Sequence, residues 1–288
     1  MNKANAKILV CCHKKDIMAT QEPYLPIQLG KALTDVDLGI TSDDSGENIS
    51  IKNRSYCELT GIYWAWKNLQ ETNIIGLCHY RRYFDFHGIC QHFKPYTIFP
   101  SSTFPDINLS IPDTIMEEVY KGAIILPRQE NYPMSSMMQF NNMHSSIDMN
   151  IITDIIKAEF DDYYSRAVWK VLVTNNKLSL CNMFIMNWTC FDAYCQWLFH
   201  ILEKAESIID ISHYSPYQQR FYGFLAERLL NVWVYAEKKK IIRYPMIFIS
   251  DLEDKLSTIP SWKYGIGCSL NNTMNFIRKV EKKFRLVP

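Results

Sequence analysis

Short apolar runs alternate with segments of helical periodicity along the first 250 residues, and this alternation restricts the fold more than any other feature of the sequence. Short apolar runs are typical of buried strands, whereas apolar residues spaced three and four apart indicate helices. We expect strands at Ala6 to Cys12, Asp37 to Ile40, Ile74 to His79, Gly122 to Leu126, Leu180 to Met186 and, interrupted by Pro245, Ile241 to Ile249. We expect helices at Asn53 to Leu69, Ile147 to Phe160, Ser165 to Asn175, Phe191 to Glu206 and Gln218 to Lys239.

Two further segments have weaker patterns. Tyr24 to Leu33 is expected to form a helix or an irregular connection. Ser110 is expected to cap a helix that has Pro112 in its first turn. The aromatic-rich stretch from Phe93 to Phe104 either shapes an acceptor pocket or forms a packed loop.

Strands that alternate with helices predict an α/β fold with a mainly parallel sheet flanked by helices. We place one domain at residues 1–250 and a C-terminal extension at residues 251–288. In such sheets ligands bind beyond the carboxyl ends of the strands. The side chains expected at that edge follow the apolar runs: His13-Lys14-Lys15, Ser42-Asp43-Asp44, His79 to Arg82, Arg128 and Asn187.

Composition and missing motifs exclude several classes of protein. The 31 basic and 30 acidic side chains leave a formal charge of +1, whereas general nucleic-acid binders carry a broad basic excess. The nine cysteines contain no CxxC pair, which favours reduced, buried thiols in a cytoplasmic protein. We expect neither a signal peptide nor a membrane span, since the apolar runs are too short. The sequence also lacks the GxGxxG, Walker A, GxSxG and HExxH motifs.

The segment His79-Tyr80-Arg81-Arg82-Tyr83 is the sharpest local feature of the sequence. A guanidinium group offers a planar fork of donors that matches phosphate oxygens, so two arginines at a strand end suit a diphosphate. A surface ion pair with a carboxylate is the commoner use of such residues.

Several acidic and metal-ligating residues have two interpretations each. Asp43, Asp44 and Glu47 share a polar loop. In one interpretation the loop binds a cation, as in a metal-dependent hydrolase, or a sugar hydroxyl. In the other it is a solvated turn, in which such residues are common. Asp35 and Asp37 form a D-x-D pattern. We interpret it as a chance match, because no strongly predicted strand leads into it. The group His87, Cys90 and His92 lacks a fourth zinc ligand.

Two features in the last quarter of the chain also have two interpretations each. Each is either a functional site or an ordinary charged part of the surface. Glu227 either forms an exposed pair with Arg228, the favoured interpretation, or faces a cleft as a general base. Residues 276–287 form a basic amphipathic pattern that either docks on the domain or lies on an anionic membrane face.

Several segments together resemble a bacterial family from capsule and exopolysaccharide clusters, long catalogued as a domain of unknown function and regarded as glycosyltransferases. The resemblance runs from about residue 8 to about residue 235. Its most specific blocks are Tyr56 to Gly61 (YCELTG) and His79 to Phe84 (HYRRYF). The other matching segments are Cys12 to Lys14, Asp43 to Ser50, Asn53 to Asn68, Ile125 to Pro127, Asn182 to Met186 and Gly223 to Leu229.

The resemblance implies a GT-A-like, Rossmann-like domain that transfers a hexose, with galactose in its pyranose or furanose form as the best match, from a UDP-sugar to a glycan or lipid-linked acceptor. It implies work at the inner membrane face without contact to nucleic acid. A non-catalytic nucleotide-sugar- or glycan-binding component of a polysaccharide assembly complex is the alternative.

The resemblance also implies roles for single residues. Glu227 would act as the base, and Arg81 or Arg82 would neutralise the leaving diphosphate. The donor would contact Cys12, His13, Lys14, Asp44, Asn53, Glu58, His79 and Asn182. The HYRR segment occupies the place where many GT-A enzymes carry a metal-binding D-x-D, and this departure argues against dependence on Mn²⁺ or Mg²⁺. Asp85 remains a candidate lone metal ligand.

Overall fold

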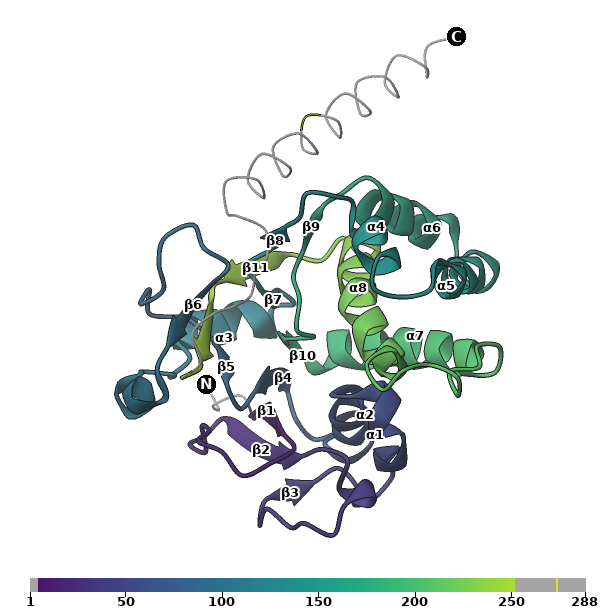
Figure 1. Ribbon diagram of the computed structural model, residues 1–288. Helices are drawn as coiled ribbons and strands as arrows, with labels where there is room; N and C mark the ends of the chain where they lie inside the picture. The colour runs from purple at the N-terminus through teal and green to yellow at the C-terminus, as the bar shows by residue number, and fades with distance from the viewer. Residues whose placement is uncertain (1–4, 252–272, 274–288) are drawn as a thin grey trace.

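The computed structural model describes residues 5–251 and Thr273, and the predicted C-terminal extension with its basic helix lies otherwise outside this range. Within the described range, ten strands form one sheet whose main path runs β11-β7-β10-β4-β1-β2-β3 (Figure 1). The strands of this path are β1 (Ala6–Cys12), β2 (Tyr24–Gln28), β3 (Thr41–Ser42), β4 (Ile74–His79), β7 (Ile124–Pro127), β10 (Phe184–Asn187) and β11 (Ile241–Tyr244).

Most neighbours in this sheet are parallel. The pairs β1–β2, β1–β4, β2–β3 and β7–β11 are parallel, and β10 alone runs antiparallel to both of its neighbours on the main path. Three strands extend the sheet from β4, namely β5 (Arg82–Phe84), β6 (Tyr96–Phe99) and β12 (Met246–Ile249). A separate pair consists of β8 (Glu130–Asn131) and β9 (Lys177–Leu178). The predicted α/β class with a mainly parallel sheet is confirmed.

Helices cover both faces of the sheet, so its central strands are buried on both sides. In β1, Leu9 and Cys11 join one core cluster, and Ile8 and Val10 join the other, as the period of two in a strand requires. The helices of the first cluster are α1 (Asn53–Tyr56), α2 (Leu59–Asn68), α4 (Ser136–Asn141), α5 (Ser146–Glu159), α6 (Asp162–Val168), α7 (Trp188–Glu206) and α8 (Phe221–Ala236). The second cluster contains α3 (Asp113–Tyr120) and the short helix η3 (Ser101–Asp106).

Short 3₁₀ and π-helical segments account for the remaining helical residues of the described range. Three are 3₁₀ turns, η1 (Lys31–Leu33), η2 (Ser50–Lys52) and η5 (Gln218–Arg220), and η4 (Trp169–Val173) is a π-helical turn that continues α6. The predicted helix from Ser165 to Asn175 therefore starts earlier, as α6, and ends in this turn. The predicted helices Phe191 to Glu206 and Gln218 to Lys239 correspond to α7 and to η5 with α8.

Several local predictions are wrong in detail. Tyr24 to Gln28 is a strand, because it pairs in parallel with β1 and tolerates Pro26 within that pairing. The next strand is Thr41–Ser42 and not Asp37 to Ile40. Ser110 caps no helix, since the N-cap of α3 is Pro112.

Two further corrections bear on the site. The predicted helix from Asn53 to Leu69 is broken at Cys57, where φ is 51° and α1 ends before α2 begins. Because β10 is antiparallel, its last residue Asn187 pairs with Ile74 at the opposite edge of the sheet from the carboxyl ends of β1 and β4. The side chain of Asn187 there caps α7 by accepting the Cys190 N–H at 2.9 Å. Asn187 is therefore not part of the predicted ligand edge.

Candidate active site

Side chains from four distant segments meet where β4 ends and β10 begins. His79 is the last residue of β4, and Asn182 precedes the first residues of the antiparallel neighbour β10. Glu58 precedes α2, and Glu227 lies in α8. Hydrogen bonds join all four segments at the turn formed by Cys181 and Asn182, so the structure brings four of the predicted site residues together.

This turn has an unusual backbone that its neighbours stabilise. Cys181 and Asn182 have φ values of 70° and 50°, a left-handed conformation that costs free energy in residues other than glycine. The His79 Nε2–H donates to the Cys181 carbonyl at 2.8 Å, and the Cys181 N–H donates to Glu227 Oε1 at 3.0 Å. The bond to a carbonyl fixes the proton of neutral His79 on Nε2. Strain held in this way is a frequent property of functional sites.

Asn182 connects the turn to two further elements. Its Nδ2 donates to Glu58 Oε1 at 2.8 Å and to the Gly223 carbonyl in α8 at 3.0 Å. The side chain is 1% exposed, and its Oδ1 has no hydrogen-bond partner among the described residues. Asn182 therefore positions Glu58 and α8 in addition to any contact with a ligand.

Three carboxylates and three guanidinium groups interact at this site. Burial raises the pKa of Glu58, Glu130 and Glu227 above the usual value, and the positive charge of Arg82 opposes that rise in all three. For Glu227, the adjacent Arg228 also lowers the pKa, whereas the charge of Glu58 raises it. Arg220 acts on Glu58 in the same direction as Arg82. A site with raised carboxyl pKa values and nearby cations is typical of acid–base chemistry.

The two adjacent arginines have different roles. Arg81 forms an ion pair with Asp16 at 2.9 Å, so the ion-pair interpretation applies to it. Arg82 is the first residue of β5, stacks on Phe248 at 5.1 Å and has no carboxylate ion pair among the described residues. Arg82 is therefore the guanidinium group that is free to bind an anion.

One face of α8 lines the site. Between Phe221 and Leu230 only Phe224 and Glu227 are not buried, and with Arg220 they form a stripe at spacings of four and three. The Arg220 guanidinium lies over the Phe224 ring at 5.1 Å, and its Nε donates to Cys57 Sγ at 3.4 Å. Sequence analysis did not single out Arg220, Phe224 or Glu130 as site residues, although the spacing of Arg220, Phe224 and Glu227 was a usable signal.

The predicted exposed pair of Glu227 and Arg228 is wrong. The Arg228 side chain is 5% exposed and donates to Glu227 Oε2 at 2.8 Å. It also donates to the Phe224 carbonyl at 2.8 Å and to Gln139 Oε1 at 2.5 Å. Glu227 is 17% exposed and therefore remains accessible from the site.

An aromatic wall continues from Phe224 of this stripe. The rings of Tyr217 and His144 lie 5.2 and 4.9 Å from the Phe224 ring, and Tyr217 is 45% exposed. Apolar ring faces beside polar groups are a common way to bind sugar rings, because the rings cover the apolar C–H face.

The segment after β1 borders the site with its exposed residues. Cys12 is 1% exposed and directs its Sγ to the Ile27 carbonyl at 3.5 Å, within the sheet. His13 and Lys14 are exposed beside Tyr80, and His13 lies within electrostatic reach of Arg220. The buried position of Cys12 restricts its side chain to a structural contact.

Asp44 and Asn53 make their described contacts elsewhere. Asp44 is exposed and accepts the Ser42 hydroxyl at 2.6 Å. Asn53 donates to the Cys57 carbonyl at 2.8 Å and to the Thr60 hydroxyl at 3.0 Å, which supports the break between α1 and α2. The fully buried carboxylate of this region is Asp43, which accepts bonds from Gly30, Lys31, Ser50 and Thr60. The turn interpretation therefore describes this loop better than a cation site does.

The residues that the structure describes do not form a metal site. Asp85 accepts the backbone N–H groups of His87, Gly88, Ile89 and Cys90 at 2.7–3.1 Å. Burial acts to raise its pKa, but these bonds together hold it below the usual value. Across residues 5–251, no group of three His, Cys, Asp or Glu side chains is placed to hold a metal ion. We therefore derive no step through a metal.

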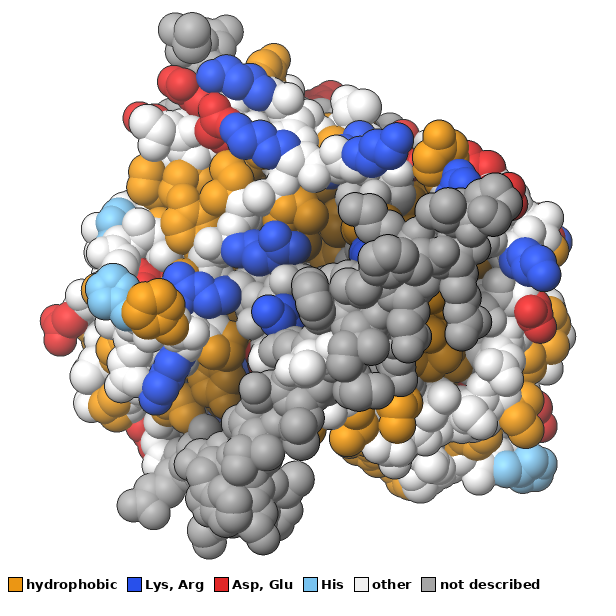
Figure 2. Space-filling model, turned by 90° about the horizontal axis from the view of Figure 1, so that it is seen from above, with side chains coloured by type: hydrophobic (Ala, Val, Ile, Leu, Met, Phe, Trp, Pro, Cys, Tyr) orange, Lys and Arg blue, Asp and Glu red, His pale blue; other side chains and the backbone are white. Residues whose placement is uncertain are grey.

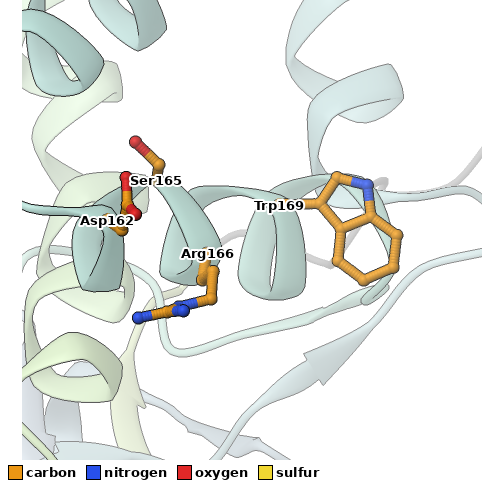
Figure 3. A pocket seen from close by; sticks show the side chains of 4 residues that line it. All are labelled: Asp162, Ser165, Arg166 and Trp169. Carbon is orange, nitrogen blue, oxygen red and sulfur yellow. The ribbon is translucent and has the colours of Figure 1, made fainter. Parts of the chain in front are cut away.

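On the face in Figure 2, Lys and Arg side chains lie across the middle, with hydrophobic side chains between them, whereas Asp and Glu lie mostly near the rim. A hollow of about 290 Å³ lies elsewhere, on α6 with η4, and a second of about 280 Å³, between α4, α5 and η5, is lined in part by His144 of the aromatic wall. Figure 3 shows that Ser165, Arg166 and Trp169 in the first hollow point in different directions. Because its side chains do not converge, we place the site at the strand ends.

We predict that Gly223→Ala destabilises the protein. A Cβ at this position would lie 3.0 Å from both Cβ and Sγ of Cys57, whose left-handed backbone leaves it little room to move. Alanine normally favours a helix over glycine, but we expect overpacking to prevail and to lower the free energy of unfolding by about 1–3 kcal/mol. Urea unfolding measures the change. A gain in stability would show that α8 and the Cys57 break are not in tight contact.

We predict that two histidines lower the free energy of unfolding as the pH drops from about 6.5 to 4. Burial and the charge of Arg82 lower the pKa of His79 to about 4, and burial and the charge of Arg228 lower that of His144 to about 4. The unfolded chain, with histidine pKa near 6.5, thus binds more protons in this range. Urea unfolding at several pH values measures the fall, and His144→Phe should reduce it. An equal fall in that variant would contradict the assignment to His144.

The sheet and its helices define an α/β protein with a charged site at its strand ends. Residues 7–239 match the family described as "Domain of unknown function (DUF4422)", and the chain belongs to this family. The fold is similar to the apo structure of the bifunctional glycosyltransferase WbbM, with a TM-score of 0.75 and 26% sequence identity over 89% of this chain. The chain spans 47% of that structure's length. No curated protein gave a significant match.

These comparisons support the α/β fold and a glycosyltransferase-like family. Among the described residues, no helix combines the length and apolar character needed to cross a membrane.

Proposed function

We propose that this chain is a glycosyltransferase that moves a hexose from a UDP-sugar to a glycan or lipid-linked acceptor. The observation that carries the proposal is the group of Arg82, Arg220 and Glu227 at the strand ends of a fold similar to a glycosyltransferase. Galactose, in pyranose or furanose form, is the proposed sugar, and capsule or exopolysaccharide synthesis is the proposed role.

The chemistry needs a base for the acceptor and a cation for the leaving group. An acceptor hydroxyl attacks the anomeric carbon, the bond from that carbon to the diphosphate oxygen breaks, and its electron pair leaves with UDP. We assign the hydroxyl proton to Glu227, whose raised pKa suits a base. We assign the growing charge on the diphosphate to Arg82 and Arg220, because guanidinium groups bind phosphate oxygens bidentately.

The other site residues position these groups. His79 and Glu58 hold the Cys181–Asn182 turn, which is bonded to α8, and we propose that Asn182 and His13 face the donor. The aromatic wall of Tyr217, Phe224 and His144 lies on the Glu227 side and is our proposed acceptor surface. Lys14 and residues 276–287 supply positive charge toward an anionic membrane in this proposal, with the protein in the cytoplasm.

A thermal-shift panel of UDP, GDP and CDP sugars, with manganese or with a chelator, tests the donor assignment. A ligand that binds the folded state raises Tm by mass action. We expect a shift with UDP-galactose or UDP-galactofuranose that persists with the chelator. No shift with any nucleotide sugar would contradict the proposal. Binding without turnover would support a non-catalytic binding component instead.

A further inference from the structure

The loop between β5 and β6 exposes two large apolar side chains. The Phe93 side chain is 96% exposed and Ile89 is 44% exposed. The other aromatic residues of this stretch pack inward, since Phe104 is buried in the second core cluster and Phe99 packs against it. A packed loop thus explains Phe104 and Phe99 but leaves Phe93 without a structural role.

The loop holds Phe93 in a defined place. Asp85 fixes the start of the loop through its four backbone hydrogen bonds. The Gln91 N–H donates to the Thr97 hydroxyl at 2.8 Å, and Arg128 donates to the Lys94 carbonyl at 2.9 Å. Phe93 is therefore presented by an ordered loop that projects from the sheet (Figure 1).

The backbone of Phe93 does not favour phenylalanine. Its φ is 66°, the left-handed region in which glycine and asparagine are favoured and bulky residues are rare. A residue chosen for the turn alone would be Asn or Gly. An exposed ring at an unfavourable backbone position points to a contact made by the ring itself.

The charge around the ring indicates the partner. From Phe86 to Pro105 the sequence contains no acidic residue, and Lys94 and Arg128 lie on and beside the loop. An apolar tip with cations around it is complementary to an anionic lipid surface, where rings enter the interface and cations meet headgroups. Arg82 of the site begins β5, the strand that leads into this loop.

We propose that residues 87–94 form a membrane-docking loop, with Phe93 and Ile89 entering the interface of an anionic bilayer and Lys94 and Arg128 meeting its headgroups. The loop is separate in sequence from residues 276–287. It would place the site at the membrane surface, but lipid binding by the loop does not require glycosyl transfer.

The test is co-sedimentation of the full chain with vesicles of about 70% phosphatidylcholine and 30% phosphatidylglycerol. We expect Phe93→Asn to lower the ratio of bound to free protein about 5–10-fold. Because Asn suits the left-handed backbone, Tm should stay equal or rise. Phe93→Trp should keep binding within about twofold, since Trp prefers the membrane interface.

Tyr120→Asn is the matched control, because Tyr120 is 61% exposed on α3 and lies outside the loop. Its binding should equal that of the unchanged protein. Equal binding by Phe93→Asn, loss in Phe93→Trp, or no binding of the unchanged protein to these vesicles would overturn the proposal. The UDP-sugar thermal shift of Phe93→Asn reports separately on the proposed function, which can fail or hold independently of the loop.

Discussion

Glu227→Gln is expected to lower the rate of sugar transfer by about 10²–10⁴-fold, the usual contribution of a positioned general base. Glutamine keeps an oxygen that can accept the Cys181 N–H but cannot take the acceptor proton. Donor binding should persist, and a UDP-sugar should still raise Tm. Turnover with radiolabelled UDP-hexose and a thermal shift on the same sample measure the two properties.

The variant has a structural cost that must be separated from the chemical one. Arg228 is buried and pairs with Glu227 at 2.8 Å, so losing the charge should lower the free energy of unfolding by about 1–3 kcal/mol. Glu203→Gln on the exposed face of α7 is the matched control and should leave turnover unchanged. Turnover by folded Glu227→Gln within threefold of the unchanged protein would exclude Glu227 as the base.

The pH dependence provides a second check on Glu227. A base must be ionised, so the rate should fall as the pH drops through the pKa of Glu227. Burial places that pKa above the usual glutamate value, which moves the acid limb of the rate profile to higher pH. Protein stability falls over part of the same range, so the fraction of folded protein has to be measured at each pH.

Arg82→Met should weaken UDP-sugar binding about 10–100-fold, because charge-assisted bonds to phosphate contribute about 1.5–3 kcal/mol. Arg82 has no carboxylate ion pair among the described residues and is available to an anion. Isothermal titration with UDP-galactose measures the loss. The variant should also shift the acid limb of the rate profile further to higher pH, because Arg82 lowers the pKa of Glu227.

Arg81→Met is the matched control for this prediction. Arg81 is already paired with Asp16 at 2.9 Å, so its loss should change UDP-sugar affinity less than about threefold. An Arg81 effect as large as that of Arg82 would contradict the separate roles of the two arginines. It would also imply that the Asp16 pair opens when the donor binds.

The sequence was sufficient to predict the fold class, because the central strands can be recognised from short local runs of apolar residues. Ala6–Cys12 and Ile74–His79 are continuous apolar runs, and both are strands with the predicted bounds. Tyr24–Gln28 was missed because its strand pairing comes from β1 and β3, which are neighbours in space and not in sequence. The direction of β10 was missed for the same reason, and with it the position of Asn187.

The site was predictable only in part. Residues that follow strands, such as His79 and Arg82, were found by their position after an apolar run. Glu130 comes from the short strand β8 and Arg220 from η5, and only the folded chain brings Glu130 near Glu227 and Arg220 near Glu58. The burial of Arg228 likewise follows from Gln139 and Phe140, which lie about 90 residues earlier in the chain.

The most direct test of the central claim is transfer by the purified chain. Radiolabelled UDP-galactose and UDP-galactofuranose would be incubated with a bacterial lipid extract as acceptor, with Glu227→Gln in parallel. We predict label in the lipid fraction with the unchanged protein, and at least about 100-fold less with the variant. Equal labelling by both proteins, or no turnover of either donor by folded protein, would contradict the claim that these strand-end residues catalyse sugar transfer.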